Sequence, residues 1–196
     1  MRSVLAGLVA TAAIALTAPA SASFSQDQAA ELARGATIVE PLDYGQGEHH
    51  FVGGVSYLVI DDDVPHLSSI ARDVTRFREL LPNVVDAKLL SIAPSGKAKV
   101  RVVHKVGPMQ GGYTLQIAFS EEGRLGRFFL DKTAQNSIDD AWGFIRLTPL
   151  PGGKRTLVTW GVLFDLGPGV LRSMFESRIR RAALSYPSRL ANAAQH

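Results

Sequence analysis

The sequence has 196 residues, of which 46% are hydrophobic and 20% are charged, with 21 Lys and Arg against 18 Asp and Glu. This composition is typical of one folded domain, and a net charge of +3 is too small to favour a nucleic-acid-binding protein. The absence of cysteine excludes disulfide bonds and a lipid-modified cysteine.

The first 22 residues have the three parts of a secretory signal peptide, namely Arg2, an apolar run over 4–18 and the small-residue site Ala20-Ser21-Ala22. The apolar run is shorter than the roughly 20 residues that a membrane span needs. We therefore expect cleavage after Ala22, with Ala20 as the alternative. The product is an exported protein, periplasmic or secreted, with a net charge of about +2, since Arg2 leaves with the signal.

Residues 23–50 are predicted to be an N-terminal lead-in to a domain over 51–196. The stretch "QDQAAELARGA" favours a short helix, and "PLDYGQGEHH" is rich in turn-forming residues. His49 and His50 form a pair without a third ligand at metal spacing, which favours a solvated loop, so no metal is expected.

A strand and one or two short helices are predicted next. "VGGVSYLVIDDDV" alternates as a buried strand does and ends at Asp61-Asp62-Asp63, which lacks the glycine and glutamate of a calcium loop and is expected to cap a helix. Pro65 fits the first turn of that helix, Asp73 divides it or restarts it, and Pro82 ends it. Its apolar face is formed by Ile70, Val74, Phe77 and Leu81.

Six strands follow Asn83 and pair as three hairpins when residues are counted across their turns. A two-residue loop at Ser95-Gly96 places Leu89 opposite Val102, Ala87 opposite His104 and Val85 opposite Val106, with the charged residues Asp86, Lys88, Lys99, Arg101 and Lys105 on the other face. The second hairpin pairs Leu115 with Leu130 and Ile117 with Phe128. The third pairs Ile145 with Trp160 and Leu147 with Val158. Each hairpin then has an apolar inner face.

The last element is a long amphipathic helix over "GVLRSMFESRIRRAALSYPSRLANAAQ". Its apolar stripe consists of Leu171, Met174, Phe175, Ile179, Ala182, Ala183 and Tyr186. A stripe of this width needs a large apolar surface, which the inner face of the sheet supplies. Trp142 and Phe144 fall on the outer face by the same counting, where they form a patch for a partner or membrane unless a bulge turns them inward.

This order of elements resembles the START and polyketide-cyclase superfamily with the helix-grip fold, and most closely its coenzyme-Q-binding branch. The resemblance covers roughly residues 53–190 and depends on "VTRFRELLPNVVDAKLL", on "IRLTPLPGGKRTLVTWGVLFDLG" and on a final helix that breaks near Tyr186-Pro187. It implies an α+β fold, in which a curved antiparallel sheet of about seven strands wraps around the long C-terminal helix. The short helices are expected to close one end of a cavity.

The resemblance also implies that an apolar small molecule, such as a lipid, quinone or polyketide, binds between sheet and helix. No cofactor is expected. The expected lining is Val100, Val102, His104, Leu115, Ile117, Phe128, Leu130, Ile145, Leu147, Val158, Trp160, Val162, Phe175 and Ile179. The alternative is that these residues fill a packed core.

His104 is the only ionisable residue that the counting places on the inner face of the central strands. It would donate a hydrogen bond to a ligand carbonyl, act as acid or base in a cyclase, dehydratase or hydrolase, or bond to a backbone carbonyl in the core. No nucleophile motif or phosphate loop accompanies it. The sequence therefore favours a carrier over an enzyme, and leaves transient membrane contact open.

Overall fold

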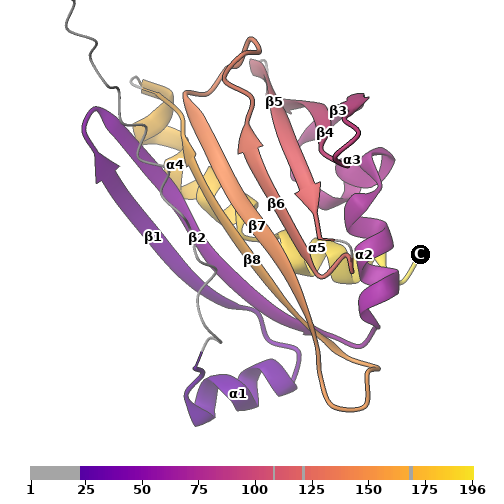
Figure 1. Ribbon diagram of the computed structural model, residues 1–196. Helices are drawn as coiled ribbons and strands as arrows, with labels where there is room; N and C mark the ends of the chain where they lie inside the picture. Colours follow the sequence, from indigo (N-terminus) through magenta and orange to yellow (C-terminus); the bar gives the residue numbers. More distant parts are fainter. Residues whose placement is uncertain (1–22, 108, 121, 168–169) are drawn as a thin grey trace, which may run out of the picture.

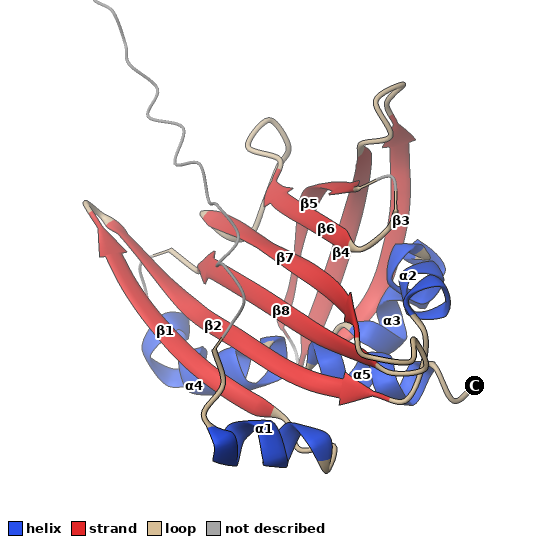
Figure 2. Ribbon diagram, turned by 60° about the horizontal axis from the view of Figure 1, so that its bottom comes forward, coloured by secondary structure: helices blue, strands red, loops and turns tan. Residues whose placement is uncertain are grey.

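The computed structural model describes residues 23–107, 109–120, 122–167 and 170–196, and these form one curved antiparallel sheet with helices against it (Figures 1 and 2). The strands are β1 (Ile38–Gln46), β2 (His49–Ile60), β3 (Val84–Ile92), β4 (Ala98–Val106), β5 (Met109–Phe119), β6 (Leu125–Leu130), β7 (Asp140–Pro149) and β8 (Thr156–Asp165). The helices are α1 (Gln26–Ala33), α2 (Val64–Arg72), the 3-10 turn η1 (Val74–Arg76), α3 (Phe77–Leu80), α4 (Val170–Ala183) and α5 (Tyr186–Ala193).

The strand order is β1-β2-β8-β7-β6-β5-β4-β3, so the sheet is open and β1 and β3 are its edges. The chain crosses from β2 near one edge to β3 at the other through α2, η1 and α3, and then returns by successive hairpins. Helices α4 and α5 lie across the concave face of the sheet (Figure 2). This arrangement confirms the predicted α+β helix-grip architecture, with eight strands where about seven were expected.

Local sequence signals determine where the short helices begin and end. The Asp63 carboxylate caps α2 by accepting a hydrogen bond from the His66 N–H at 2.9 Å, and Pro65 lies in the first turn. Asp73 ends α2 and caps η1, so the predicted division of the helix is confirmed. The C-terminal helix also breaks where expected, since α4 ends at Ala183 and α5 begins at Tyr186.

The registers of two hairpins agree with residue counting. Leu115 pairs with Leu130 and Ile117 with Phe128 in β5–β6. In β7–β8 the pairs are Ile145 with Trp160 and Leu147 with Val158.

The predicted register of the β3–β4 hairpin is wrong. Val102 pairs with Ala87 and His104 with Val84, because the N–H of Ala93 bonds to the carbonyl of Lys97 and closes a three-residue loop with Gly96 at φ 77°. Two bulges in β3 shift the register further. Val102 and His104 still face inward, but Leu89, on the edge strand β3, is 42% exposed.

The edge strand β1 was not predicted, because Pro41, Asp43 and Gly45 made its sequence look like a loop. Pro41 is compatible with an edge strand, where its missing N–H interrupts no ladder between two neighbours. Gln46 pairs with His49 across a tight turn in which Gly47 has φ 62°. Part of the predicted lead-in therefore belongs to the sheet. The predicted helix within it is confirmed as α1, whose Leu32 packs with Tyr57.

Candidate functional site: an apolar cavity under the C-terminal helices

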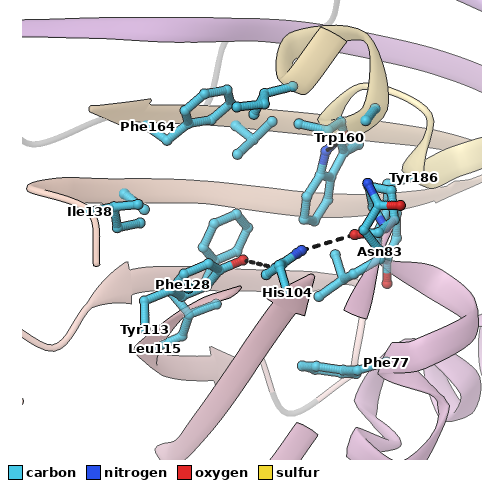
Figure 3. Close-up of a pocket in the computed structure, with 18 of the residues that line it drawn as sticks. Phe77, Asn83, His104, Tyr113, Leu115, Phe128, Ile138, Trp160, Phe164 and Tyr186 are labelled. Atoms are coloured by element: carbon cyan, nitrogen blue, oxygen red, sulfur yellow. Dashed lines mark hydrogen bonds between the residues drawn. The ribbon is translucent and has the colours of Figure 1, made fainter. Parts of the chain in front are cut away.

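A cavity of about 480 Å³ lies between the concave face of the sheet and the helices (Figure 3). Strands β4 to β8 supply its floor, Phe77 and Leu81 from the α3 segment close one end, and Ile179 and Tyr186 come from α4 and α5. Its described lining is mainly apolar. The expectation that the short helices close one end of the cavity is consistent with these positions.

Eight of the residues expected to line a ligand site line this cavity. They are His104, Leu115, Ile117, Phe128, Ile145, Trp160, Val162 and Ile179. They come from five different strands and from α4, so the curvature of the sheet and the overlying helix bring them together.

Five other predicted lining residues face inward but belong to a packed core beside the cavity. They are Val100, Val102, Leu130, Leu147 and Val158. Val100, Val102 and Val158 are fully buried, in one cluster with Leu67 of α2 and Leu190 of α5. These two helices pack directly on that end of the sheet and fill it. Phe175, also predicted, lies in the part of α4 whose side chains are outside the described residues.

The sequence reasoning missed several lining residues. Tyr113 lies two residues before Leu115 on β5, and Phe164 two residues after Val162 on β8, so the same alternation extended by one step would have identified both. Ile138 lies in the loop before β7, where no periodic pattern indicates its direction. Phe77 was predicted only as part of a helix face.

Trp160 connects the sheet to the break between α4 and α5. Its ring stacks on Phe128 at a centroid distance of 5.2 Å and on Tyr186 at 4.1 Å. Its Nε1–H donates to the carbonyl oxygen of Ala183 at 2.9 Å. Ala183 is the last residue of α4, so its carbonyl has no partner within the helix. One side chain thus forms part of the cavity wall and satisfies the helix end.

His104 and Tyr113 form the polar pair of the cavity (Figure 3). The Nδ1 atom of His104 lies 2.9 Å from the carbonyl oxygen of Pro82, and its Nε2 atom lies 2.8 Å from the Tyr113 hydroxyl. Asn83 has φ 58°, and its carbonyl accepts from the Lys105 N–H, which fixes the turn that carries Pro82. The expected turn at Pro82 therefore also orients the histidine.

Burial controls the protonation of this pair. It lowers the pKa of His104 below its ordinary value of 6.5, although the bond to Pro82 acts in the opposite direction. Burial also raises the pKa of Tyr113 well above its ordinary value. Both side chains are therefore neutral near pH 7. Among the described lining residues, the other ionisable side chains are Arg178 and Tyr186, and no carboxylate accompanies them.

His49 and His50, expected in a solvated loop of the lead-in, instead begin strand β2 and contact acidic residues. His49 Nδ1 lies 2.8 Å from a buried Asp165 carboxylate oxygen. His50 lies near Asp43 and Glu176, three groups close enough to share an ion. Arg180, however, already bonds to the Asp43 and Glu176 carboxylates at 2.7 and 2.9 Å. The cluster is therefore an ion-pair network that joins α4 to the β1–β2 edge.

Trp142 and Phe144 lie on the convex face as predicted. Their neighbour Ile145 lines the cavity, and a Cβ atom added to Gly143 would meet the inward-facing ring of Phe128. Trp142 and Phe144 are both half-buried, and a side chain at Gly161 would overlap the Phe144 ring, which shows that Phe144 covers this glycine. Neither was turned inward by a bulge. Among the described helices, none has the length and apolar character that crossing a membrane requires.

No family model and no curated protein matches this chain at significant similarity. Solved structures do match. A STAR-related lipid transfer protein from Xanthomonas axonopodis superposes with a TM-score of 0.62 at 13% identity, covering 82% of this chain and 94% of that one. A START superfamily protein from Mycobacterium smegmatis gives a TM-score of 0.60 at 13% identity, over 72% and 95% of the two chains.

The Zhui aromatase/cyclase from Streptomyces sp. R1128 gives a TM-score of 0.59 at 13% identity, covering 81% of this chain and 94% of that chain. At such identities the likeness shows the fold. The chain therefore has the helix-grip fold shared by START proteins and polyketide cyclases, as the order of its elements predicted.

Proposed function

We propose that this protein is exported and binds or carries an apolar small molecule in the cavity between the sheet and the C-terminal helices. The observation that carries the proposal is the cavity of about 480 Å³, with mainly apolar walls and a few polar groups. Ligand sites in proteins have this composition and typically measure roughly 300–1,000 Å³.

The division between cavity and core supports this proposal. Leu67, Leu190, Val100 and Val158 pack without space at one end of the sheet. The same chain leaves a cavity farther along the same face, where Phe128, Ile145 and Ile179 line it. Interiors are normally packed to the density of organic crystals, so an unfilled apolar space of this size is a feature that needs an occupant.

The similar structures support two ligand classes. The name of one describes a lipid transfer protein and the name of another an aromatase/cyclase. A lipid or a polyketide-like molecule suits the apolar walls, and a quinone, the ligand class of the coenzyme-Q-binding branch, suits them equally.

The alternative function is an enzyme of the cyclase, dehydratase or hydrolase type, with His104 as acid or base. The His104–Tyr113 pair favours it, because a neutral imidazole in an apolar cavity can exchange protons. Both ring nitrogens of His104 are already engaged, however, and among the described lining residues no carboxylate is present as a second acid or base. A carrier is therefore the better-supported function.

Native mass spectrometry of the protein, recovered by mild extraction from a periplasmic fraction, tests the proposal. We expect a mass above that of the chain from about Ser23 to His196, with the excess lost on denaturation and identified as an apolar molecule. Ile117→Trp, which narrows the cavity, is the matched variant and should lose the adduct. A bare chain in both proteins, with no uptake of added lipid or quinone, would refute ligand carriage.

Residues 1–22 lie outside the described part of the chain, so export needs a separate test, and the same periplasmic sample provides it. N-terminal sequencing should begin within a few residues of Ser23, as the Ala20-Ser21-Ala22 site predicts. An intact Met1 on soluble protein from the cytoplasm would exclude export.

A further inference from the structure

The hydrogen bonds of His104 determine where its protons lie. The carbonyl oxygen of Pro82 can only accept, so the Nδ1 atom that faces it at 2.9 Å carries a hydrogen and donates. Because burial keeps the imidazole neutral, the other ring nitrogen, Nε2, has a lone pair and no hydrogen. His104 therefore presents an acceptor to Tyr113.

The Tyr113 hydroxyl must then donate its only hydrogen to His104 Nε2, across the 2.8 Å that separate them. The rings stack at a centroid distance of 5.3 Å, which fixes the phenol against the imidazole. The remaining hydrogen-bonding capacity of the Tyr113 oxygen consists of lone pairs. Among the described residues, no hydrogen-bond donor to this oxygen is present.

Tyr186 also lines the cavity and is buried, whereas four other polar residues of the lining lie where water reaches them. Asn83, Gln110, Ser137 and Arg178 line the cavity and are all exposed, whereas His104 and Tyr113 are partly buried. An anionic head group would pair with Arg178 at the exposed side. A polar group of a ligand that reaches the side of the cavity formed by His104 and Tyr113 meets the Tyr113 oxygen.

We propose that the cavity selects a neutral ligand with a hydroxyl group, an aliphatic alcohol or a phenol, which donates its hydrogen to the Tyr113 oxygen. This inference depends on the proposed function, because it specifies the ligand class of the same cavity. Of the three roles considered for His104, the bond to a backbone carbonyl is the one present, and it leaves no hydrogen for a ligand carbonyl. The Nδ1 hydrogen of His104 is used by Pro82, and its Nε2 atom forces Tyr113 to act as an acceptor.

A ligand carbonyl or ether oxygen would face the Tyr113 oxygen without a hydrogen between them. Two buried acceptors then lose their water partners and gain none, which weakens binding by about tenfold or more. A carboxylate would fare worse at this wall, because it brings a charge beside a neutral histidine and a neutral tyrosine.

The test is displacement of Nile red from the mature protein by ligands of one carbon skeleton: a long-chain secondary alcohol, its ketone, its methyl ether and the corresponding fatty acid. In the wild type we expect the alcohol to bind at least about tenfold more tightly than the ketone and the ether. The wild-type series is decisive without any variant. Equal affinities, or tighter binding of the ketone, would overturn the inference and leave the proposed function in place. Tighter binding of the acid would also overturn it, because pairing with Arg178 and not the Tyr113 oxygen would then decide the ligand class. No saturable displacement by any of the four would instead refute ligand binding.

Two variants identify the atoms responsible. His104→Leu removes the acceptor for the Tyr113 hydrogen, so the phenol becomes free to donate, the ketone gains affinity and the alcohol-to-ketone ratio falls to about one. In Tyr113→Phe the group that faces the ligand is His104 Nε2. This atom is still an acceptor, so the affinity for the ketone does not rise. A ratio unchanged by His104→Leu in a folded protein would show that the selection arises elsewhere.

Discussion

At the scale of single residues, Trp160 does more than fill space. Its ring lies between Phe128 of the sheet and Tyr186 of α5, and its N–H satisfies the Ala183 carbonyl at the end of α4. A shift of the helix pair away from the sheet would break both the stacking and the hydrogen bond. Trp160 thus holds the helices at the distance that leaves the cavity open.

Replacement of Trp160 by alanine should lower the free energy of unfolding by roughly 3–5 kcal/mol, the usual cost of emptying a large aromatic site. Trp160→Phe should cost less, because it keeps a ring and loses only the bond to Ala183. Thr159, the preceding residue, points to the other face and is buried there, so Thr159→Ala is the matched control and should cost the least. Denaturant melts measure all three, and equal losses for Trp160→Ala and Thr159→Ala would contradict this role.

The pH dependence of stability tests the state of His104. Its pKa in the folded protein is below 6.5, the ordinary value that applies to the unfolded chain. Between the folded and unfolded pKa values, the unfolded chain therefore binds more protons than the folded one. Stability should therefore fall as the pH drops below about 6.5, and this loss should be absent from His104→Leu. The difference between the two proteins is the readout, because the other histidines are common to both. An identical pH slope in both proteins would show that His104 titrates normally.

At the scale of elements, the close packing of β1 and β8 against β2 depends on two glycines. Gly53 and Gly54 have φ values of 157° and 146°, which side chains rarely adopt. A Cβ atom on Gly54 would overlap the carbonyl oxygen of Glu40 in β1, and one on Gly53 would overlap that of Val162 in β8. These glycines let the edge strand β1 and the central strand β8 approach β2 closely from both sides.

Gly54→Ala should therefore destabilise the protein by at least about 1–3 kcal/mol, from backbone strain and from the collision with β1. Gly45→Ala on β1 is the control, since nothing lies within 4 Å of its added Cβ atom. Thermal melts of the two variants should separate clearly. Similar melting temperatures would mean that β2 relaxes without cost.

The strand pairings show which parts of the fold could be predicted from the sequence. Counting across a turn is reliable where strands are regular, and it placed Ile117 opposite Phe128 and Ile145 opposite Trp160. It failed for β3–β4, because a three-residue loop and two bulges leave no distinct mark in the residue pattern. It also missed β1, where residues that normally break strands lie at a sheet edge that tolerates them.

At the scale of the whole molecule, the inner face of the sheet has two parts. The sequence correctly placed Val102 and Ile117 on the inner face, but alternation alone cannot tell which inward residues a helix covers. Val102 lies in the packed cluster and Ile117 lines the cavity, because α2, α3 and α5 gather at one end. The polar pair could not be foreseen as a unit, since the Pro82 carbonyl that orients His104 comes from a turn.

This division gives the most direct measurement of the central claim, that the cavity is a ligand site. Ile117→Trp places its added volume in the cavity, whereas Val102→Phe places it in a packed core, where overpacking costs about 1–3 kcal/mol. We expect Ile117→Trp to weaken the binding of an apolar probe such as Nile red by about tenfold or more, a change of about 1.4 kcal/mol, and to melt within a few degrees of the wild type.

Val102→Phe should show the reverse, a lower melting temperature with probe binding retained in the folded protein. Titration of the wild type and both variants with the same probe, run beside thermal melts, separates the two effects. If Ile117→Trp instead destabilised the protein as much as Val102→Phe and left probe binding unchanged, the space beneath the C-terminal helices would be part of the core and not a ligand site.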